Sequence, residues 1–449
     1  MPAKSTSQPA TTVIIGGGIA GLSAAWELQR AGRPFLLLEA APRCGGVIAT
    51  RSRDGFLAEA GPESFLAFKP AAAELCRELG LEDELIPPLP NPAGAQVWIE
   101  GRYVPLPGGW RLLHPTQLEP LQTSPLFSAG TRAAFAARWV DTGAPPADDE
   151  SVAAYLRRRW GSEAGQEIAD RIVGPLLAGV YGGDIEQLSA AAAAPPPGAG
   201  AAAPPAGPMF LTLRDGMSLL VEALLRQLPA DAIRCTQPVT ALEEDAGGYR
   251  IRLGSGECLR AVAVILAVPA FHAATMLRGL DAALAKTLAA IPYASSVNIN
   301  CAFRSAPSLP PGHGFLAVGA APLLACTFAH QKFAGRAPAV AALLRLFYGD
   351  ATADWADERL LEQARHDLAA CCAITRAPDW FELRRCPRAL PQYTVGHARR
   401  QAAITQALSR HAGLGLAGGA YQGVGMPDCI ASGRAAAQRV LLTAGAGGS

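Results

Sequence analysis

Three glycines near the N-terminus have the spacing of a phosphate-binding turn. Gly16, Gly18 and Gly21 follow the β-branched run 12–15 and precede an apolar stretch with helical spacing. In such a turn the first glycine permits the tight bend, the second lets the backbone approach a pyrophosphate, and the third lets the helix pack against the strand. The helix N-terminus then faces the phosphates with free N–H groups. The pattern predicts a dinucleotide site, although by itself it also fits an ordinary glycine-rich turn.

An acidic residue narrows the class of dinucleotide. Glu39 lies 18 residues after Gly21, at the end of the apolar run that begins at Pro34. A carboxylate there can accept hydrogen bonds from ribose hydroxyl groups but would repel a 2′-phosphate. NADP is therefore disfavoured, and both NAD and FAD remain.

Two further glycine-rich segments favour FAD over NAD. Arg43-Cys-Gly-Gly46 comes just beyond Glu39, and Gly423-Val-Gly425 lies near the C-terminus. NAD needs only one such turn, whereas FAD is long enough to need both. Pro427 suits the first turn of a helix, whose positive end could stabilise negative charge on a reduced flavin ring. A plain helix start is the alternative interpretation of this last segment.

The glycine-rich turns can bind one cofactor together only if the fold brings them to the same edge of a sheet. Strand 12–15, a helix that stops at Gly32 and strand 34–39 form a strand–helix–strand unit, which predicts an α/β fold with a parallel, Rossmann-like sheet. A second strand, glycine-rich turn and helix occupy 413–442. Residues 97–104 predict a hairpin that turns at Glu100 and Gly101.

The chain of 449 residues exceeds the size at which one core usually keeps growing, so we expect several domains. Alternating and helical patterns predict further strands at 296–303 and 340–347 and helices at 133–140, 151–160 and 357–373. The expected division is an FAD-binding domain (1–90, 209–270 and 410–449), a mixed-sheet substrate-binding domain (91–108 and 271–409), a helical subdomain (109–190) and a low-complexity loop (191–208).

Composition excludes several classes of function. The formal net charge is +1 and only 17% of residues are charged, which leaves no electrostatic footprint for nucleic acid. The ten cysteines contain no C-x-x-C pair, so we expect buried thiols and no metal site. The segment 1–12 lacks the apolar region of a secretory signal, and no unbroken apolar run is long enough to span a membrane. These observations predict a cytoplasmic protein.

Six segments carry a family resemblance. Two resemble the amine-oxidase-like flavoprotein superfamily: Val13–Leu22 and Leu38–Gly46. Four more resemble oxygen-dependent protoporphyrinogen oxidases: Gly55–Phe65, Pro175–Asp184, Leu390–His397 and Ala417–Ile430. The resemblance covers nearly the whole chain.

That resemblance implies oxidation of protoporphyrinogen IX to protoporphyrin IX in heme biosynthesis. Three two-electron steps would each move hydride to the flavin N5, with O2 taking the electrons to give H2O2. Gly179 would lie near the macrocycle, and no residue is assigned as a catalytic acid or base. By motif position the FAD contacts would be Gly16, Gly17, Gly18, Ile19, Ala20, Gly21, Glu39, Ala40, Arg43, Gly46, Val47, Gly61, Pro62, Glu63, Ser64, Val239, Val424, Gly425 and Met426.

The sequence departs from the family where a substrate propionate would be anchored. Gln96 aligns where the family usually has an arginine, and Arg102 is a substitute whose alternative is a solvated hairpin residue. Coproporphyrinogen III oxidation by the same mechanism stays open, since the sequence does not resolve pocket polarity. Amine oxidation is disfavoured because neither Lys286 nor Lys332 suits the buried lysine of amine oxidases. A non-catalytic FAD scaffold is the hypothesis from another class.

The helical segment 110–140 suggests a further partner. Its apolar residues could face lipid, as part of a peripheral contact with the inner face of the cell membrane, or be buried in a core or a homodimer contact. They are Leu112, Leu113, Leu121, Leu126, Phe127 and Phe135.

Overall fold

The computed structural model describes residues 10–91, 93–139, 149–193, 207–245 and 247–445. Its first sheet has seven strands in the order β12-β2-β1-β15-β14-β13, with β21 paired to β15. These strands are β1 (Ala10–Ile15), β2 (Phe35–Leu38), β12 (Ile233–Arg234), β13 (Val239–Asp245), β14 (Gly248–Leu253), β15 (Cys258–Leu266) and β21 (Leu414–Leu416). The pairs β12–β2, β2–β1, β1–β15 and β15–β21 are parallel, while β13 and β14 are antiparallel additions. The predicted α/β class with a Rossmann-like parallel sheet is confirmed.

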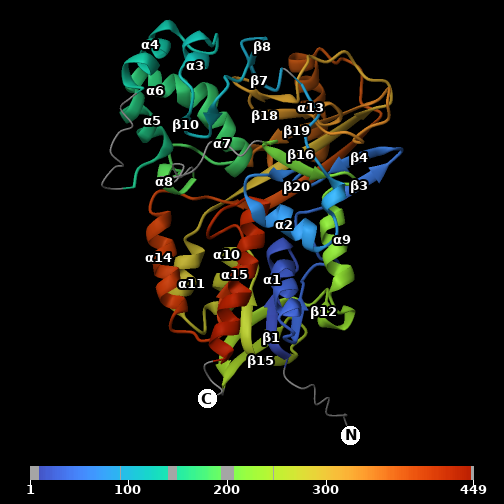
Figure 1. Ribbon diagram of the computed structural model, residues 1–449, viewed down its shortest axis with the longest axis vertical. Helices are drawn as coiled ribbons and strands as arrows, with labels where there is room; N and C mark the ends of the chain where they lie inside the picture. Colours follow the sequence, from blue (N-terminus) through green and yellow to red (C-terminus); the bar gives the residue numbers. More distant parts are fainter. Residues whose placement is uncertain (1–9, 92, 140–148, 194–206, 246, 446–449) are drawn as a thin grey trace.

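Helices cover both faces of this sheet (Figure 1). One face packs against α1 (Ile19–Arg30), α2 (Pro70–Glu78), α9 (Ser218–Gln227) and α15 (Met426–Gly445). The other face packs against α10 (Ala270–Leu277), α11 (Ala282–Ala289) and α14 (His397–Leu408). Because helices lie on both sides, every residue of β2 is buried, and the strand reads as a continuous apolar run.

The second sheet also has seven strands, in the order β20-β16-β19-β18-β17-β7-β8. They are β20 (Trp380–Pro391), β16 (Tyr293–Phe303), β19 (Ala342–Tyr348), β18 (Leu323–Phe328), β17 (Gly314–Ala317), β7 (Ala95–Ile99) and β8 (Arg102–Pro105). The β17–β7 pair is parallel and the other pairs are antiparallel, which makes the sheet mixed. Helix α13 (Asp357–Cys372) packs on one face in an apolar core. The opposite face is turned toward the first sheet.

A helical part lies beside the second sheet, at the upper left of Figure 1. Two of its helices begin at serine caps, because Ser128 accepts from the N–H of Thr131 and Ser151 from that of Ala154. Its elements are β9 (Trp110–Arg111), β10 (His114–Pro115), α3 (Glu119–Thr123), α4 (Ala129–Arg138), α5 (Val152–Trp160), α6 (Ser162–Ile168), a π-helical turn (Ala169–Val173), α7 (Gly174–Tyr181) and α8 (Ala190–Ala193). Of the expected low-complexity loop, 191–193 lie in α8 and 194–206 lie outside the described residues.

Short elements join the two sheets. Strand β11 pairs with both β5 and β6, and β3 forms a hairpin with β4. Their bounds are β3 (Thr50–Arg53), β4 (Phe56–Glu59), β5 (Phe65–Leu66), β6 (Leu85–Ile86), β11 (Phe210–Leu213) and α12 (Ala329–Lys332), with 3-10 turns at Glu82–Glu84, Ala230–Ala232 and Asp350–Thr352.

The lipid-facing interpretation of segment 110–140 is wrong for five of its six apolar residues. Their exposed fractions are 2% or less, because they pack into the core of the helical part: Leu113, Leu121, Leu126, Phe127 and Phe135. Only Leu112 has a substantially exposed side chain. Within the described residues, no helix is both long enough and apolar enough to cross a bilayer. Contact with a membrane surface or a second copy stays a prediction.

Helices α1 and α15, which begin at the two glycine-rich turns, approach each other closely at one glycine. A Cβ atom on Gly433 would lie 2.1 Å from the carbonyl oxygen of Ala20 in α1. No real Cβ atom comes that close to backbone, so only glycine allows this approach. The contact sets the distance between the helices that start at the N-terminal and C-terminal turns.

We therefore expect Gly433→Ala to force the two helices apart and to lower the free energy of unfolding by about 1–3 kcal/mol, as overpacking of a close contact does. Chemical denaturation followed by circular dichroism measures this change. Gly279→Ala is the matched control, because a Cβ atom there meets nothing within 4 Å. Equal stability of the two variants would contradict the close-contact argument.

Candidate cofactor and substrate site

The N-terminal glycine turn has the geometry of a dinucleotide cradle. Gly16 has φ +107°, and a Cβ atom on it would lie 2.4 Å from the carbonyl oxygen of Ala267. A Cβ atom on Gly21 would lie 1.9 Å from the carbonyl oxygen of Gly16. At Gly18, by contrast, a Cβ atom meets nothing within 4 Å. Two glycines thus let the chain pack, and the one between them borders open space at the N-terminus of α1, where a pyrophosphate would bind.

Glu39 lies directly beneath this turn. Its carboxylate accepts hydrogen bonds from the N–H of Gly17 at 2.6 Å and from the N–H of Ala41 at 2.7 Å. The N–H of Gln237 donates to the Glu39 carbonyl oxygen at 2.9 Å, which brings the start of β13, at Val239, to the same end of the sheet. Glu39 and Val239, both predicted FAD contacts, therefore lie at the same end of the sheet.

Two more predicted segments meet beside the turn. The N–H of Gly45 donates to the Gly17 carbonyl oxygen at 2.8 Å, and a Cβ atom on Gly61 would lie 2.0 Å from the carbonyl oxygen of Val47. Arg43 is exposed, but its guanidinium donates to carbonyl oxygens within 44–48, so it closes its own turn. Val47 is 48% exposed on the surface of this turn.

The C-terminal glycine turn joins the same group of segments. The N–H of Gly425 donates to the Asp428 carboxylate at 3.1 Å, and Lys69 forms an ion pair with that carboxylate at 2.7 Å. Met426 is buried in the core that also holds Ile48. Helix α15 begins at Met426, so Pro427 lies in its first turn as expected. The second strand–turn–helix unit is thus present and lies next to the first.

The residues present therefore fit FAD. An open position at Gly18 borders a helix N-terminus, a carboxylate lies at the ribose position, and a second helix N-terminus at Met426 lies farther along. FAD bound here would be held by the predicted contacts named above. Those individual contacts stay predictions.

A cluster of buried charges ties the cofactor segments to the second sheet. Lys332, the last residue of α12, forms a hydrogen-bonded ion pair with Glu63, and both side chains are less than a fifth exposed. Arg345 of β19 donates to the Gly61 carbonyl oxygen at 2.6 Å, and Asn300 of β16 donates to the Glu59 carbonyl oxygen at 3.0 Å. The loop 61–64 is thus held from the side of the second sheet.

Burial and neighbouring charges act oppositely on the two acids of this cluster. Burial raises the pKa of Glu59 to about 7, although hydrogen bonds from the Met217 N–H and the Thr50 hydroxyl lower it. Burial also acts to raise the pKa of Glu63, but the charges of Lys332 and Arg345 hold that pKa below its ordinary value. Glu63 is therefore an anion at neutral pH and anchors the cationic side of the cluster.

The residues predicted to contact the substrate lie on α7, β7 and β8. Gly179 of α7 is exposed, and a Cβ atom on it meets nothing within 4 Å, so the helix surface is open there. Gln96 is 6% exposed, and its amide donates to the Pro311 carbonyl oxygen. Arg102 lies on the exposed hairpin beside Glu100, with which it forms an ion pair at 3.6 Å. Gln96 and Arg102 therefore already have partners, Pro311 and Glu100, and Gly179 is not among them.

Several residues of this region were not predicted as site residues. Lys332 was not expected at a buried position, but it ends α12 with a side chain that is 17% exposed, and the scarcity of lysine, four in the chain, is the signal that could have marked it. Arg345 interrupts the apolar strand 342–348, which is the sequence sign of a buried cation. Tyr393 donates to the Gly419 carbonyl oxygen and accepts from the Gly423 N–H, both at 2.7 Å, and so supports the C-terminal turn.

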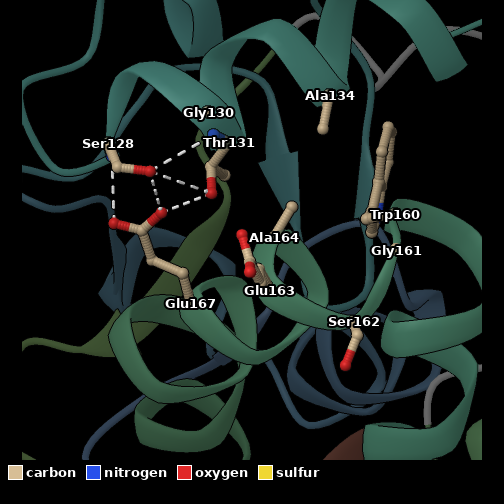
Figure 2. Close-up of a pocket in the computed structure, with 10 residues that line it drawn as sticks. All are labelled: Ser128, Gly130, Thr131, Ala134, Trp160, Gly161, Ser162, Glu163, Ala164 and Glu167. Carbon is tan, nitrogen blue, oxygen red and sulfur yellow. Dashed lines mark hydrogen bonds between the residues drawn. The ribbon is translucent and has the colours of Figure 1, made fainter.

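A separate cavity of about 490 Å³ lies in the helical part (Figure 2). Glu167 faces Ser128 and Thr131 there and accepts hydrogen bonds from both, while Trp160 lines the opposite side. Burial acts to raise the pKa of Glu167, but these hydrogen bonds hold it below its ordinary value. The Glu167 carboxylate therefore holds Ser128 and Thr131 at the start of α4. The glycine turns do not line this cavity.

Comparison with known proteins gives the class. Residues 19–441 match the family of flavin-containing amine oxidoreductases, and the chain belongs to that family. Its cofactor is FAD, as the glycine turns predicted.

Particular relatives narrow the class. The chain is 32% identical to a coproporphyrinogen III oxidase of Bacillus subtilis (strain 168), over 96% of this chain and 97% of the relative. It is 30% identical to a protoporphyrinogen oxidase of Homo sapiens, over 96% of this chain and 98% of the relative. A crystal structure from Exiguobacterium sp. 255-15, described as a candidate protoporphyrinogen oxidase, matches with a TM-score of 0.83 and 31% identity over 96% and 98% of the two chains. The resemblance to porphyrinogen oxidases is therefore confirmed.

The open position at Gly18 gives a test of the cradle. Gly18→Ala should leave the fold intact, with a loss of about 1 kcal/mol for an alanine at the helix N-cap. The added methyl group should lower FAD affinity at least about tenfold, because it displaces phosphate from the N–H groups of α1. Flavin absorbance after dialysis measures the loss. Gly16→Ala should instead unfold the protein, and a Gly18→Ala variant that keeps full FAD would contradict the cradle.

The buried pair can be tested by a double-mutant cycle. Lys332→Met leaves the Glu63 carboxylate buried without its ammonium partner, which should cost about 3–5 kcal/mol of unfolding free energy. Adding Glu63→Gln should restore much of this loss. Arg157→Met, which breaks the exposed pair with Glu186, is the control and should change little. Additive effects of the two cluster substitutions, measured by denaturation, would argue against a coupled pair.

Proposed function

We propose that this chain oxidises a porphyrinogen to a porphyrin, and specifically protoporphyrinogen IX to protoporphyrin IX in heme biosynthesis. The observation that carries the proposal is the extent of the similarity. Relatives named for porphyrinogen oxidation match through the cofactor segments, α7 and the second sheet alike, over 96% of the chain.

FAD bound in the cradle would supply a hydride acceptor for the substrate, and O2 would take up the electrons as H2O2. The protein would bind and orient the reactants. Arg345 and Asn300 donate to the backbone of 59–61, and Lys332 pairs with the Glu63 side chain, so these contacts would hold the loop 61–64 against the bound cofactor. The N-terminus of α15 would place its positive end near the flavin ring.

The proposed reaction needs little acid–base catalysis by side chains of the protein. Burial lowers the pKa of His397 to about 4, and burial also lowers the pKa of His330, so both are neutral at physiological pH. His397 is stacked on Tyr393 at 3.9 Å between ring centroids, which is a supporting contact. We propose that protons leave through water or by pyrrole tautomerisation, with no residue as general base.

Coproporphyrinogen III is the second candidate substrate. It is favoured by the name of the Bacillus relative, which is as similar to this chain as the human one. Amine oxidation is less well supported, although Lys332 is buried, because its ammonium is paired with Glu63 and is not free to act on a substrate.

Turnover under air tests the proposal directly. Purified protein should release H2O2 and produce porphyrin fluorescence from protoporphyrinogen IX, from coproporphyrinogen III or from both, and the ratio of kcat/KM values decides the substrate. Benzylamine serves as the amine control and should give no peroxide. Bound flavin without porphyrin formation from either porphyrinogen would overturn the function.

A further inference from the structure

One face of the second sheet is polar and is turned toward the cofactor segments. Asn300 of β16 reaches the Glu59 carbonyl oxygen, so its side of the sheet faces that segment. In the antiparallel register, Asn300 lies opposite both Arg345 of β19 and Glu382 of β20. Directly opposite residues share a face of the sheet. Residues at even steps from them share that face as well.

Arg384 belongs to this face. It lies two residues beyond Glu382 on β20 and directly opposite Asn298, a residue that is 7% exposed. Phe347 of β19 lies opposite Asn298 on the other side. The Arg345 guanidinium stacks on the Phe347 ring at 4.8 Å. Arg384 therefore shares a polar surface with Asn298 and the Arg345–Phe347 pair.

Along β16, this surface lies between the cofactor loop and α7. Asn300 contacts the residue 59 backbone at one end. At the other end, Gly182, which caps α7, lies against Ala294 and the Ser295 carbonyl oxygen. Asn298 is between these contacts. A ligand that spans from the loop 61–64 to Gly179 would pass over it.

Arg384 has no acceptor among the described residues. Its Nε is buried and unpartnered, and its guanidinium makes no hydrogen bond, ion pair or ring contact with any of them. Glu382 is close enough to interact electrostatically with Arg384, but its carboxylate pairs with Arg51 at 3.4 Å. The Nε of Arg345 is also buried without a partner. The half-buried Arg384 guanidinium therefore keeps donors available for an anionic ligand.

The other cations near the site are already engaged. Lys332 binds Glu63, and Arg336 donates to the Thr212 hydroxyl and to the carbonyl oxygens of residues 213 and 214. Arg102 pairs with Glu100 on the surface hairpin. Arg345 keeps its Nε unpaired but already donates to the Gly61 carbonyl oxygen, whereas Arg384 makes no hydrogen bond or ion pair within the described chain.

We propose that Arg384, supported by the amide of Asn298, binds a propionate carboxylate of the porphyrinogen and so replaces the anchor that Gln96 cannot supply. The inference rests on the proposed function, because it needs a carboxylate-bearing macrocycle as substrate. It places the propionate carboxylate beside β20. It also predicts that the affinity for the substrate depends on the number of its propionate groups.

Binding of a stable porphyrin tests this anchor without turnover. Coproporphyrin III and its tetramethyl ester are titrated in one detergent buffer, with quenching of protein fluorescence as the readout. Arg384→Met should weaken binding of the free acid about 10- to 100-fold, as loss of one charge-assisted hydrogen-bonded contact does. It should leave ester binding unchanged, and Arg384→Lys should recover part of the loss.

Arg304→Met is the matched control, since Arg304 follows β16 but pairs with Asp54 on the surface. It should bind both porphyrins as the wild type does. Equal weakening of acid and ester by Arg384→Met would overturn the carboxylate contact. Loss of flavin absorbance in that variant would also overturn it, because Arg384 would then serve the cofactor. Failure of the wild type to bind either porphyrin would instead remove the proposed function itself.

Discussion

The structure depends on burying opposite charges where the cofactor loop meets the second sheet. Glu59 and Glu63 come from the end of β4 and the turn after it, whereas Lys332, Arg336 and Arg345 come from segments some 270 residues later. A buried carboxylate or guanidinium is tolerated only when partners offset the loss of water. The buried carboxylates therefore require the buried cations, and the cations require the carboxylates. This mutual requirement fixes the position of the loop that follows β4.

This constraint explains why the predicted site is assembled from such distant segments. The loop 61–64 lies against the turn at Val47 because Gly61 leaves no side chain between them, and it lies against β19 because Arg345 holds its carbonyl oxygen. The same loop thus touches both the Rossmann-like sheet and the mixed sheet. A flavin bound with its ring at this end of the cradle would lie at the junction of the two sheets.

The cations at and near the polar face of the mixed sheet differ in their partners. Lys332 is paired with Glu63, Arg336 donates to the segment 212–214, and Arg345 donates to the Gly61 carbonyl oxygen, so each of them holds protein groups in place. Arg384 lies on the same face and bonds to nothing that the structure describes. Arg384 is the cation to which we assign an anionic ligand, and propionate groups are the anions that the proposed porphyrinogen substrate would bring.

The sequence by itself determined the features that depend on local backbone geometry and periodicity. Gly16 and Gly21 need conformations or close contacts that only glycine allows, and the apolar run at β2 is continuous because both faces of a parallel strand are covered. The α/β class, the hairpin at Glu100 and the FAD cofactor followed from such signals. The tertiary structure alone decided what depends on register and on contacts between distant segments. It buried Leu113 and Phe135 in the core of the helical part, engaged Gln96 with Pro311, paired Lys332 with Glu63 and placed Arg384 on the sheet face that contacts residue 59. A one-residue shift of β20 would send Arg384 to the opposite face, and no spacing within a single strand specifies that pairing.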